Sequence, residues 1–440
     1  MKSYGNKMSD NQREIEKNLP PHVSNAEFVF SGKNVNGQYD ELYISNEILD
    51  KNLLVLGEIG SGKTNVIAEF TRMIIARLKR HEKIIILDVK GDYSRMLRKT
   101  HIPAIYFGIH EDKNCWNIFE DLWAFGDELS SAELRAEEIA PCFFKGQKSE
   151  KTPYFVNAAS VLFSILLKYM LRQAYKTEDY SKLNNAGVRD MLDTLDYNGC
   201  LEIINSYKYF AFAGSFLNCG DGSNTDSSGV LSEIAIMKEK IFTEAFAEVG
   251  DFSLTKFAYG NKGGIVVLKS DLSLEEKTNP VFAAVLDNAI KAAAAPTANT
   301  NGLTFILDEF GRLPHMDKIE MGFSLLRDKH IHFILGIQTV EQMQRQNIPE
   351  INYKVLLDLI LNVIILRCGA ATVEHIQNTL GTRQVYITYT AADGSSKTEL
   401  KFRPVIETED VINLERGGAF VKIARDTNYA IFRFHFDRYQ

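Results

Sequence analysis

The sequence GEIGSGKT, at residues 57–64, is the feature that most restricts how this chain can fold. It follows the apolar run NLLVLG, which is typical of a buried strand, and it leads into a stretch of helical periodicity from Thr64 to Arg80. A strand, a glycine-rich loop and a helix in this order supply the context that the pattern G-x-x-x-x-G-K-[ST] requires. The loop therefore predicts an α/β fold in which a strand delivers a phosphate-binding loop to the start of a helix.

Each residue type in this loop suits phosphate binding. Backbone N–H groups without bulky side chains can surround phosphate oxygens, and the N-terminus of the helix adds the positive end of its dipole. Lys63 can reach the β- and γ-phosphate oxygens, and the Thr64 hydroxyl can ligate Mg²⁺. The alternative is a glycine turn that matches by chance, which the flanking strand and helix make the weaker interpretation. The predicted nucleotide-binding residues are Gly57, Glu58, Ile59, Gly60, Ser61, Gly62, Lys63, Thr64 and Asn65.

Further apolar runs indicate a mainly parallel sheet that is covered on both faces. They include KIIILD, IPAIYFG, GGIVVLKS, LTFILD, HFILGIQT, NVIILRC and GAFVKIA. Between about residues 125 and 225 the strand pattern gives way to helical stretches. We therefore predict a flexible segment at 1–26, a discontinuous nucleotide-binding domain at 27–124 and 230–440, and an all-α inserted domain at 125–229.

The composition is that of a folded globular protein, with 45% hydrophobic and 24% charged residues. The net charge of −7 argues against a generally basic surface, although a local basic groove or ring lumen remains compatible with it. Five widely spaced cysteines without metal-ligand spacing predict core thiols in a reducing cytoplasm. The apolar stretch 158–173 is interrupted by Ser164 and Lys168, so we expect a buried helix there rather than a membrane span.

An acidic pair ends the run LTFILDEFG. Open α/β sheets bind ligands at the carboxyl ends of their strands, where Asp308 and Glu309 are expected to lie. Asp308 can hold Mg²⁺ through water, and Glu309 can polarise the attacking water, which points to hydrolysis of the nucleotide. The alternative is an acidic pair at the start of a helix.

Several other polar residues have two interpretations from spacing alone. Asp88 can face the nucleotide or cap the following turn. Gln338 follows a strand and can contact a γ-phosphate or its water, or be an ordinary turn residue. Arg327 can be a solvent-exposed charge or an arginine delivered to a neighbouring subunit. His330 and His332 alternate along a strand, but no Cys or carboxylate cluster joins them in the sequence, which makes a metal site the weaker interpretation.

The order of these landmarks resembles the conjugative type IV secretion coupling proteins of the TraD and TrwB kind. About 245 residues separate the phosphate loop from Asp308, with a helical module between them. The resemblance extends from about residue 27 to 437 and rests on GEIGSGKT, ILDVKGDY, CWNIFEDL, EVGDFSLTKF, DEFGRLP, LLRDKHIHFILGIQTVEQM, NTLGTRQV and RPVIETEDVINLERGGAFVKI.

The resemblance implies a hexameric RecA-like ATPase that uses ATP and Mg²⁺ and pumps DNA toward a secretion channel. It implies that Gln338 corresponds to the family's strand-end glutamine and that Arg327 acts in trans on a neighbour. The implied partners are DNA, relaxosome or accessory proteins at the all-α domain, and type IV secretion ATPases and membrane components. Family members begin with a two-helix membrane anchor, whereas 56 polar-to-mixed residues precede Gly57 here, so we expect a cytoplasmic or peripheral location.

Two other functions share these sequence features. A receptor scaffold would dock effector or relaxosome proteins on the helical module and use hydrolysis for regulation. A cytoplasmic translocase of the HerA or FtsK kind would share the core chemistry, although DEFGRLP and the C-terminal stretch fit it less well. Strong stimulation of ATP turnover by DNA would favour a motor over the scaffold.

Overall fold

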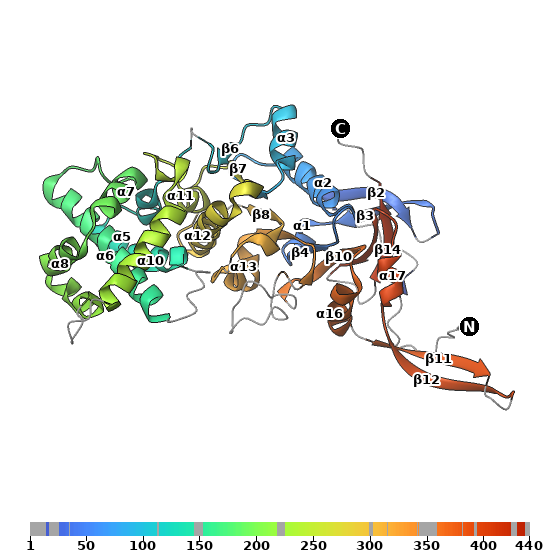
Figure 1. Cartoon of the computed structure of the whole chain (residues 1–440). Coiled ribbons are helices and arrows are strands. Elements are labelled where there is room, and N and C mark those ends of the chain that lie inside the picture. The colour runs from blue at the N-terminus through green and yellow to red at the C-terminus, as the bar shows by residue number, and fades with distance from the viewer. Residues whose placement is uncertain are drawn as a thin grey trace. The chain divides into compact units, whose positions relative to one another are not determined.

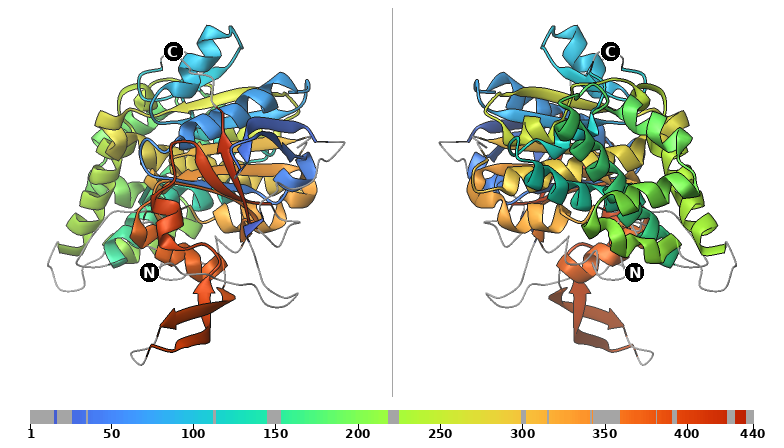
Figure 2. Two further views of the ribbon diagram at one scale, coloured as in Figure 1. Left: turned by 90° about the vertical axis from the view of Figure 1, so that its right-hand side faces the viewer. Right: turned by 90° about the vertical axis from the view of Figure 1, so that its left-hand side faces the viewer.

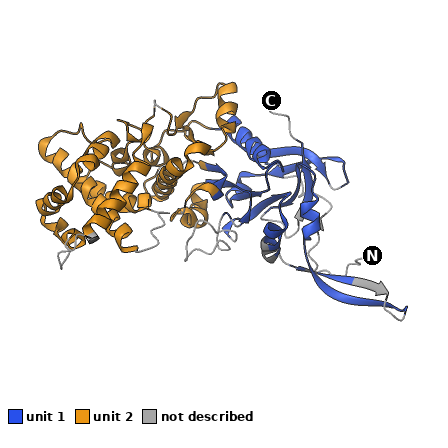
Figure 3. Cartoon of the chain, in the orientation of Figure 1, with its two compact units in different colours: residues 1–78, 305–311, 331–440 blue, residues 79–304, 312–330 orange. Residues whose placement is uncertain are grey.

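The computed structural model describes residues 15–16, 26–34, 36–111, 114–144, 153–217, 225–298, 302–314, 316–340, 342, 359–380, 382–390, 394–423 and 429–435. Apart from residues 15–16 and 26, the predicted flexible segment 1–26 lies outside this part of the chain. The chain divides into two compact units (Figure 3). Unit 1 contains residues 1–78, 305–311 and 331–440, and unit 2 contains residues 79–304 and 312–330.

Unit 1 holds the phosphate loop and most of the strands (Figure 1). Its strands are β1 (Ile15–Glu16), β2 (Phe28–Asn34), β3 (Tyr39–Ile44), β4 (Leu53–Leu56), β8 (Leu303–Asp308, which begins in unit 2), β9 (Ile331–Ile337), β10 (Asn362–Leu366), β11 (Thr382–Thr390), β12 (Ser396–Pro404), β13 (Gly418–Lys422) and β14 (Tyr429–Phe434). Its helices are α1 (Asn46–Leu49), α2 (Lys63–Ala76), α16 (Ala370–Leu380) and α17 (Thr408–Ile412), with a 3₁₀ turn at Phe310–Arg312 that extends into unit 2.

The sheet of unit 1 has the order β3-β2-β14-β13-β10-β4-β9-β8. β4 pairs in parallel with both β9 and β10, and its four residues are buried, as predicted for a central strand. Beyond β10 the sheet continues with the antiparallel strands β13, β14, β2 and β3. The α/β fold class is confirmed, and the antiparallel extension is an addition to it.

Two strands of unit 1 stand apart from this sheet. β11 and β12 form a separate two-stranded antiparallel ribbon, which follows α16 and precedes α17 in the chain and projects away from both helices (Figures 1 and 2).

Unit 2 combines a short parallel sheet with many helices. β5 (Lys83–Asp88), β7 (Gly264–Lys269) and β6 (Ile105–Phe107) are adjacent and parallel in that order. The α-helices are α3 (Asp92–Lys99), α4 (Ile118–Leu122), α5 (Leu129–Ile139), α6 (Pro153–Thr177), α7 (Asn185–Thr194), α8 (Tyr197–Ser206), α9 (Gly214–Leu217), α10 (Thr225–Ile241), α11 (Leu254–Tyr259), α12 (Glu275–Ala294) and α13 (Ile319–Leu325). Shorter 3₁₀ turns lie at Ala140–Phe144, Lys208–Ala213, Glu244–Ala247, Leu272–Leu274 and Arg327–Lys329. Every described element within residues 125–229 is helical, while the division into domains stays a prediction.

Helix α6 is the predicted buried helix. Among the helices that the structure describes, it is the one whose length and apolarity would suffice to cross a bilayer, and 61% of its most apolar window is buried. Its neighbours α5 and α10 pack against it, and Phe163 of α6 joins an aromatic cluster with Phe143, Phe242 and Trp116. Helix α6 is therefore a core element of unit 2, as expected for apolar side chains that pack among aromatic rings.

Two segments from opposite ends of the helical region meet in unit 2. Asn117 N donates to Phe252 O at 3.0 Å, and Phe252 N donates to Cys115 O at 3.1 Å. Asp121 accepts a hydrogen bond from Trp116 Nε1 at 2.6 Å and another from Ser253 Oγ. Burial raises the pKa of Asp121, while these donors act in the opposite direction. The segments CWNIFEDL and EVGDFSLTKF are thus held together by hydrogen bonds within unit 2.

The described cysteines are free thiols. Cys115, Cys200 and Cys368 are buried, and burial raises the pKa of Cys200 and of Cys368 to about 12. Thiols with such pKa values stay protonated and unreactive at neutral pH. Cys219 lies outside the described residues.

Candidate active site

The phosphate loop connects β4 to α2 in a conformation that needs glycine. Gly60 and Gly62 have φ values of 82° and 108°, which side chains on L-residues rarely permit. A Cβ on Gly57 would come within 2.9 Å of Leu366 Cβ, so the loop passes too close to β10 for any larger residue. The glycine spacing therefore has a direct conformational cause.

Three backbone hydrogen bonds hold the phosphate loop to its surroundings in unit 1. Gly57 N donates to Ile337 O at 3.2 Å, at the end of β9. Glu58 N donates to the carbonyl of Arg367 at 2.9 Å, just after β10. On the other side, Gly417 N donates to Ser61 O at 3.0 Å, just before β13. The loop is consequently positioned by three separate segments of the C-terminal half.

The predicted lysine and acidic pair lie together. Lys63 Nζ is 3.0 Å from Asp308 Oδ1 and 3.3 Å from Glu309 Oε1. The Lys63 side chain is 5% exposed and the two carboxylate side chains are 5% and 2% exposed. Buried charges require such pairing, because removing an unpaired charge from water is costly. Residues that are 245 positions apart in the sequence thus form one compact charged cluster.

Glu309 has an unusual backbone conformation. Its φ is 120°, in a region that non-glycine residues rarely adopt, and such strain typically costs about 1–3 kcal/mol. Its N–H donates to Gly336 O at 3.2 Å, and Gln338 Nε2 donates to Glu309 Oε1 at 2.9 Å and to Oε2 at 2.7 Å. The surrounding contacts therefore hold this carboxylate in one orientation. Strained residues of this kind cluster at functional sites.

Gly336 on β9 is a residue that the sequence analysis missed. A Cβ at this position would come 2.5 Å from Asp308 Oδ1 and 2.8 Å from Ile67 Cδ1. The only sequence signal is a glycine inside an apolar strand, which indicates that another group lies close to the backbone but does not identify that group. The missing side chain makes room for the carboxylate of Asp308.

We expect Gly336→Ala to displace Asp308 and to lower the free energy of unfolding by about 1–3 kcal/mol, the usual cost of overpacking. Urea unfolding checks the stability, and the Mg²⁺ dependence of nucleotide binding checks the carboxylate. Gly369→Ala is the matched control, because a Cβ on Gly369 would meet no atom within 4 Å. Equal effects of the two substitutions would contradict the prediction.

Glu58 and Arg367 form a second feature that the sequence analysis did not anticipate. Arg367 Nε donates to Glu58 Oε1 at 2.6 Å, and both side chains are partly exposed, at 36% and 41%. An acidic residue inside a phosphate loop would repel a phosphate group, so the guanidinium of Arg367 offsets this charge. Arg367 directly follows β10, as Gln338 directly follows β9.

The remaining predicted residues lie as follows. Thr64 is half-buried at the start of α2, directly after Lys63. Asp88 ends β5 in unit 2, where its Oδ2 accepts a hydrogen bond from Ser94 N at 2.7 Å, which is the capping interpretation. Burial raises the pKa of Asp88. Arg327 is exposed in unit 2, after α13. His332 Nδ1 lies 3.1 Å from Asp50 Oδ1 in unit 1.

The residues of unit 1 fit a Mg²⁺-nucleotide. A hydroxyl and carboxylates are the hard oxygen ligands that Mg²⁺ prefers, and Thr64 and Asp308 supply them. Ser61 Oγ is buried without a hydrogen-bond partner in the described structure, as expected of a loop shaped around further acceptors and donors. Among the described residues, no group of three or more His, Cys, Asp and Glu forms a separate metal cluster.

A glycine loop that leads from a parallel strand into a helix, with its lysine on a strand-end acidic pair, defines the P-loop nucleoside triphosphatases. Within this class, the family of the type IV secretion-system coupling protein DNA-binding domain matches residues 41–435. The chain belongs to this family.

Solved structures have the same fold at low sequence identity. The bacterial conjugative coupling protein TrwBdeltaN70, in its unbound monoclinic form, is 16% identical with a TM-score of 0.72, covering 90% of this chain and 87% of that one. Plasmid coupling protein TrwB in complex with ADP and Mg²⁺ is 15% identical with a TM-score of 0.69, covering 91% and 89%. VirB4 of Thermoanaerobacter pseudethanolicus is 13% identical with a TM-score of 0.53, covering 95% and 98%. No curated protein sequence matches the chain.

Proposed function

We propose that this protein is an ATP-hydrolysing coupling protein that recruits DNA and pumps it toward a type IV secretion channel during conjugation. The observation that carries the proposal is the buried cluster of Lys63, Asp308 and Glu309 at the phosphate loop of a chain in the coupling-protein family. TrwB, which has the same fold, has been crystallised with ADP and Mg²⁺ and with a non-hydrolysable ATP analogue.

In this proposal the residues of unit 1 divide the chemistry. The loop Gly57–Asn65 surrounds the phosphates, and Lys63 leaves the carboxylates to bind β- and γ-oxygens. Thr64 and Asp308 would hold Mg²⁺, which neutralises phosphate charge when it is bound. Glu309 accepts a hydrogen bond from the attacking water and orients it. Gln338 keeps the Glu309 carboxylate in position, since its amide contacts both oxygens.

Further parts of the proposal concern assembly. A homo-hexameric ring would place the exposed Arg327 of one subunit at the γ-phosphate of its neighbour, where it stabilises developing charge. The all-α domain at 125–229 would receive relaxosome or accessory proteins. Type IV secretion ATPases and membrane components would meet the ring at the cytoplasmic face of the inner membrane.

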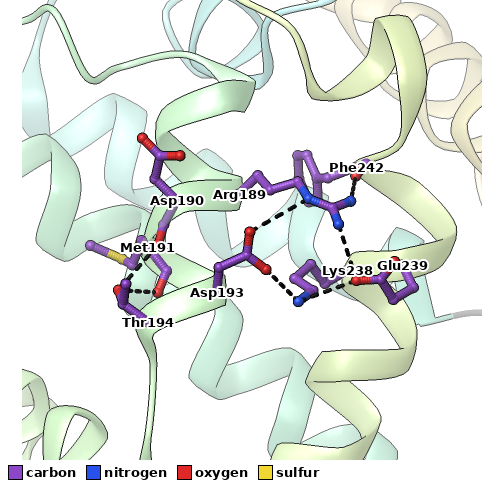
Figure 4. A network of polar contacts seen from close by, with 8 residues as sticks. All are labelled: Arg189, Asp190, Met191, Asp193, Thr194, Lys238, Glu239 and Phe242. Carbon is purple, nitrogen blue, oxygen red and sulfur yellow. Dashed lines mark hydrogen bonds and ion pairs between the residues drawn. The ribbon is translucent and has the colours of Figure 1, made fainter.

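A receptor scaffold is the second candidate, and one observation favours it. A cavity of about 420 Å³ lies between α6, α7 and the segment that joins them, with Met170, Leu183 and Met191 among its lining residues. Beside it, Arg189 and Asp193 of α7 connect to Lys238 and Glu239 of α10, which braces the wall (Figure 4). A cavity of this volume has the size of a small-molecule site, and it can equally receive a side chain that a partner protein inserts.

Measuring ATP turnover against protein concentration, with and without DNA, tests the proposal. We expect the specific rate to rise steeply with concentration, because each site would be shared between subunits, and to rise further with DNA. A specific rate that changes neither with protein concentration nor with DNA would contradict the ring motor. A rate that does not change with DNA, together with tight binding of a partner protein to residues 125–229, would favour the scaffold.

Mixing two inactive variants tests the role of Arg327. Lys63→Ala and Arg327→Ala should each lose hydrolysis, but in a one-to-one mixture about a quarter of the sites would combine an intact Lys63 with an intact neighbouring Arg327. We therefore expect phosphate release to return to about a quarter of the unaltered rate. Arg95→Ala, which removes an exposed arginine from α3, is the control and should stay active. A mixture as inactive as its components would contradict a trans-acting Arg327.

A further inference from the structure

The ribbon of β11 and β12 is exposed to an unusual degree. Its strands pair with one another from Thr382–Pro404 to Thr390–Ser396 and, within the described residues, with no other strand. Every residue of β12 from Ser396 to Arg403 is exposed. An isolated two-stranded ribbon is only marginally stable in water, so a chain that projects one is expected to cover it with a partner.

One face of the ribbon carries no charge among its described side chains. Residues that are opposite each other in an antiparallel pair lie on the same face. Gln384 is opposite Phe402, and Tyr386 is opposite Leu400, so these four share one face. Phe402 is 67% exposed and Leu400 is 46% exposed. We call these four residues the uncharged face.

The alternate residues of β12 form the opposite, cationic face. They are Lys397, Glu399, Lys401 and Arg403, all of them exposed. Lys401 Nζ lies 3.5 Å from Glu399 Oε2, which leaves an excess of positive charge on this face. Residues 382–404 contain four basic and two acidic residues, whereas the whole chain has a net charge of −7. The ribbon is therefore a local basic element in an acidic protein.

We propose that this ribbon is an arm that contacts DNA. Exposed aromatic rings beside lysines and arginines are the combination that binds nucleic-acid strands, because bases stack on the rings and phosphates attract the cations. The ribbon is two strands wide, so the long side chains of Lys397, Lys401 and Arg403 can extend round the β12 edge toward phosphates of a strand on the uncharged face.

The ribbon fits a second copy of the protein less well. Stable protein interfaces bury about 1,200–2,000 Å² around an apolar centre and are depleted in lysine. Among the exposed β12 side chains of the uncharged face, Leu400 and Phe402 are large and apolar, and the opposite face is rich in lysine. A two-stranded ribbon, by contrast, has dimensions that the major groove of DNA accepts. The inference rests on the proposed function, because it supplies a DNA contact to the proposed motor.

Both ends of the ribbon run into helices that are joined to each other. β11 begins after α16, and β12 is followed by α17. Gln377 Nε2 of α16 donates to Ile406 O at 3.0 Å and to Thr408 Oγ1 of α17 at 3.2 Å. A force on the ribbon is therefore transmitted to α16 and α17 together.

These two helices are adjacent in sequence to contacts of the phosphate loop. Arg367, whose carbonyl and guanidinium both bind Glu58, lies three residues before α16. Gly417, whose N–H binds Ser61, lies five residues after α17. The arm is thus rooted on two of the three segments that hold the phosphate loop, and DNA bound to the arm can influence the rate of hydrolysis.

Fluorescence anisotropy of the full chain with single- and double-stranded oligonucleotides, over a range of salt, tests the arm. We expect Lys397→Gln/Lys401→Gln/Arg403→Gln to reduce the slope of log affinity against log salt by about 2 for single strands and by about 3 for duplex DNA. Phe402→Ala should weaken single-strand binding by about 5- to 100-fold, because it removes a stacking ring. The unfolding transition should stay unchanged, since both variants alter exposed side chains.

Lys33→Gln/Lys79→Gln/Arg80→Gln is the matched control, because it removes the same charges from exposed positions outside the ribbon. Equal salt slopes for the ribbon and control variants would overturn the inference. So would a ribbon variant that binds DNA normally but assembles into smaller particles, which would assign the ribbon to a second copy. An unaltered chain that hydrolyses ATP but binds no DNA would instead contradict the proposed function, and the arm with it.

Gln377→Ala tests the connection between arm and loop. We expect this variant to bind DNA with unaltered affinity and to lose most of the DNA-stimulated increase in ATP turnover. Stimulation equal to that of the unaltered chain would overturn the proposed connection.

Discussion

Glu309→Gln should slow ATP hydrolysis by about 10²- to 10⁴-fold while leaving ATP bound, because the amide cannot take up a proton from the attacking water. The substitution keeps the size of the side chain, so we expect the backbone to stay at the φ of 120° that Glu309 has. Steady-state phosphate release gives the rate, and equilibrium binding of a fluorescent ATP analogue gives the affinity.

The control for this experiment is Glu47→Gln, which changes an exposed carboxylate on α1 of the same unit and should leave the rate unaltered. A loss of hydrolysis explained entirely by weaker ATP binding would contradict the role of Glu309 in catalysis. It would indicate instead that Glu309 serves mainly to hold Lys63.

Lys63→Ala should lower the free energy of unfolding of the nucleotide-free protein by about 3–5 kcal/mol, in addition to abolishing tight ATP binding. The reason is that Asp308 and Glu309 would remain buried without their counter-ion, and an uncompensated buried charge is strongly destabilising. Urea unfolding measures the change. A loss of nucleotide binding without a loss of stability would contradict this account.

Two comparisons make the stability test specific. Lys79 is also paired with a glutamate, but its side chain is 82% exposed, so Lys79→Ala should have little effect. Adding Asp308→Asn to Lys63→Ala should recover part of the lost stability, because it removes one of the two buried carboxylates that have lost their counter-ion. Equal losses in the single and double variants would contradict the electrostatic explanation.

The sequence predicts that Lys63, Asp308 and Glu309 meet at one edge of a sheet, because the signals for this arrangement are local. The spacing of Gly57, Gly62 and Lys63 defines the loop, and an apolar run that ends in Asp308 and Glu309 places the acidic pair at a strand end. Parallel pairing brings carboxyl ends to one edge of a sheet, so residues far apart in sequence become neighbours. The buried cluster around Lys63 follows from these two patterns together.

Other features depend on tertiary contacts that no local pattern encodes. Gly336 is required because the carboxylate of Asp308, from another strand, occupies the space beside it. Arg367 is important because it pairs with Glu58 of the phosphate loop. The role of Asp88 could not be predicted for a related reason, because a carboxylate that faces a ligand and one that caps a helix follow a strand in the same way; in the structure Asp88 accepts a hydrogen bond from Ser94 N. The ribbon of β11 and β12 is absent from the prediction, although QVYITYT is rich in strand-forming residues.

The ion pairs of Lys63 also bear on which ionic form of the nucleotide can enter. Asp308 and Glu309 together neutralise the Lys63 ammonium. A metal-free triphosphate would bring further negative charge to this acidic edge, whereas a metal-bound one carries its own counter-charge and can release the lysine to the phosphates. The charges of this site therefore favour binding of the metal-bound triphosphate, which is the form that can be hydrolysed, over the metal-free one.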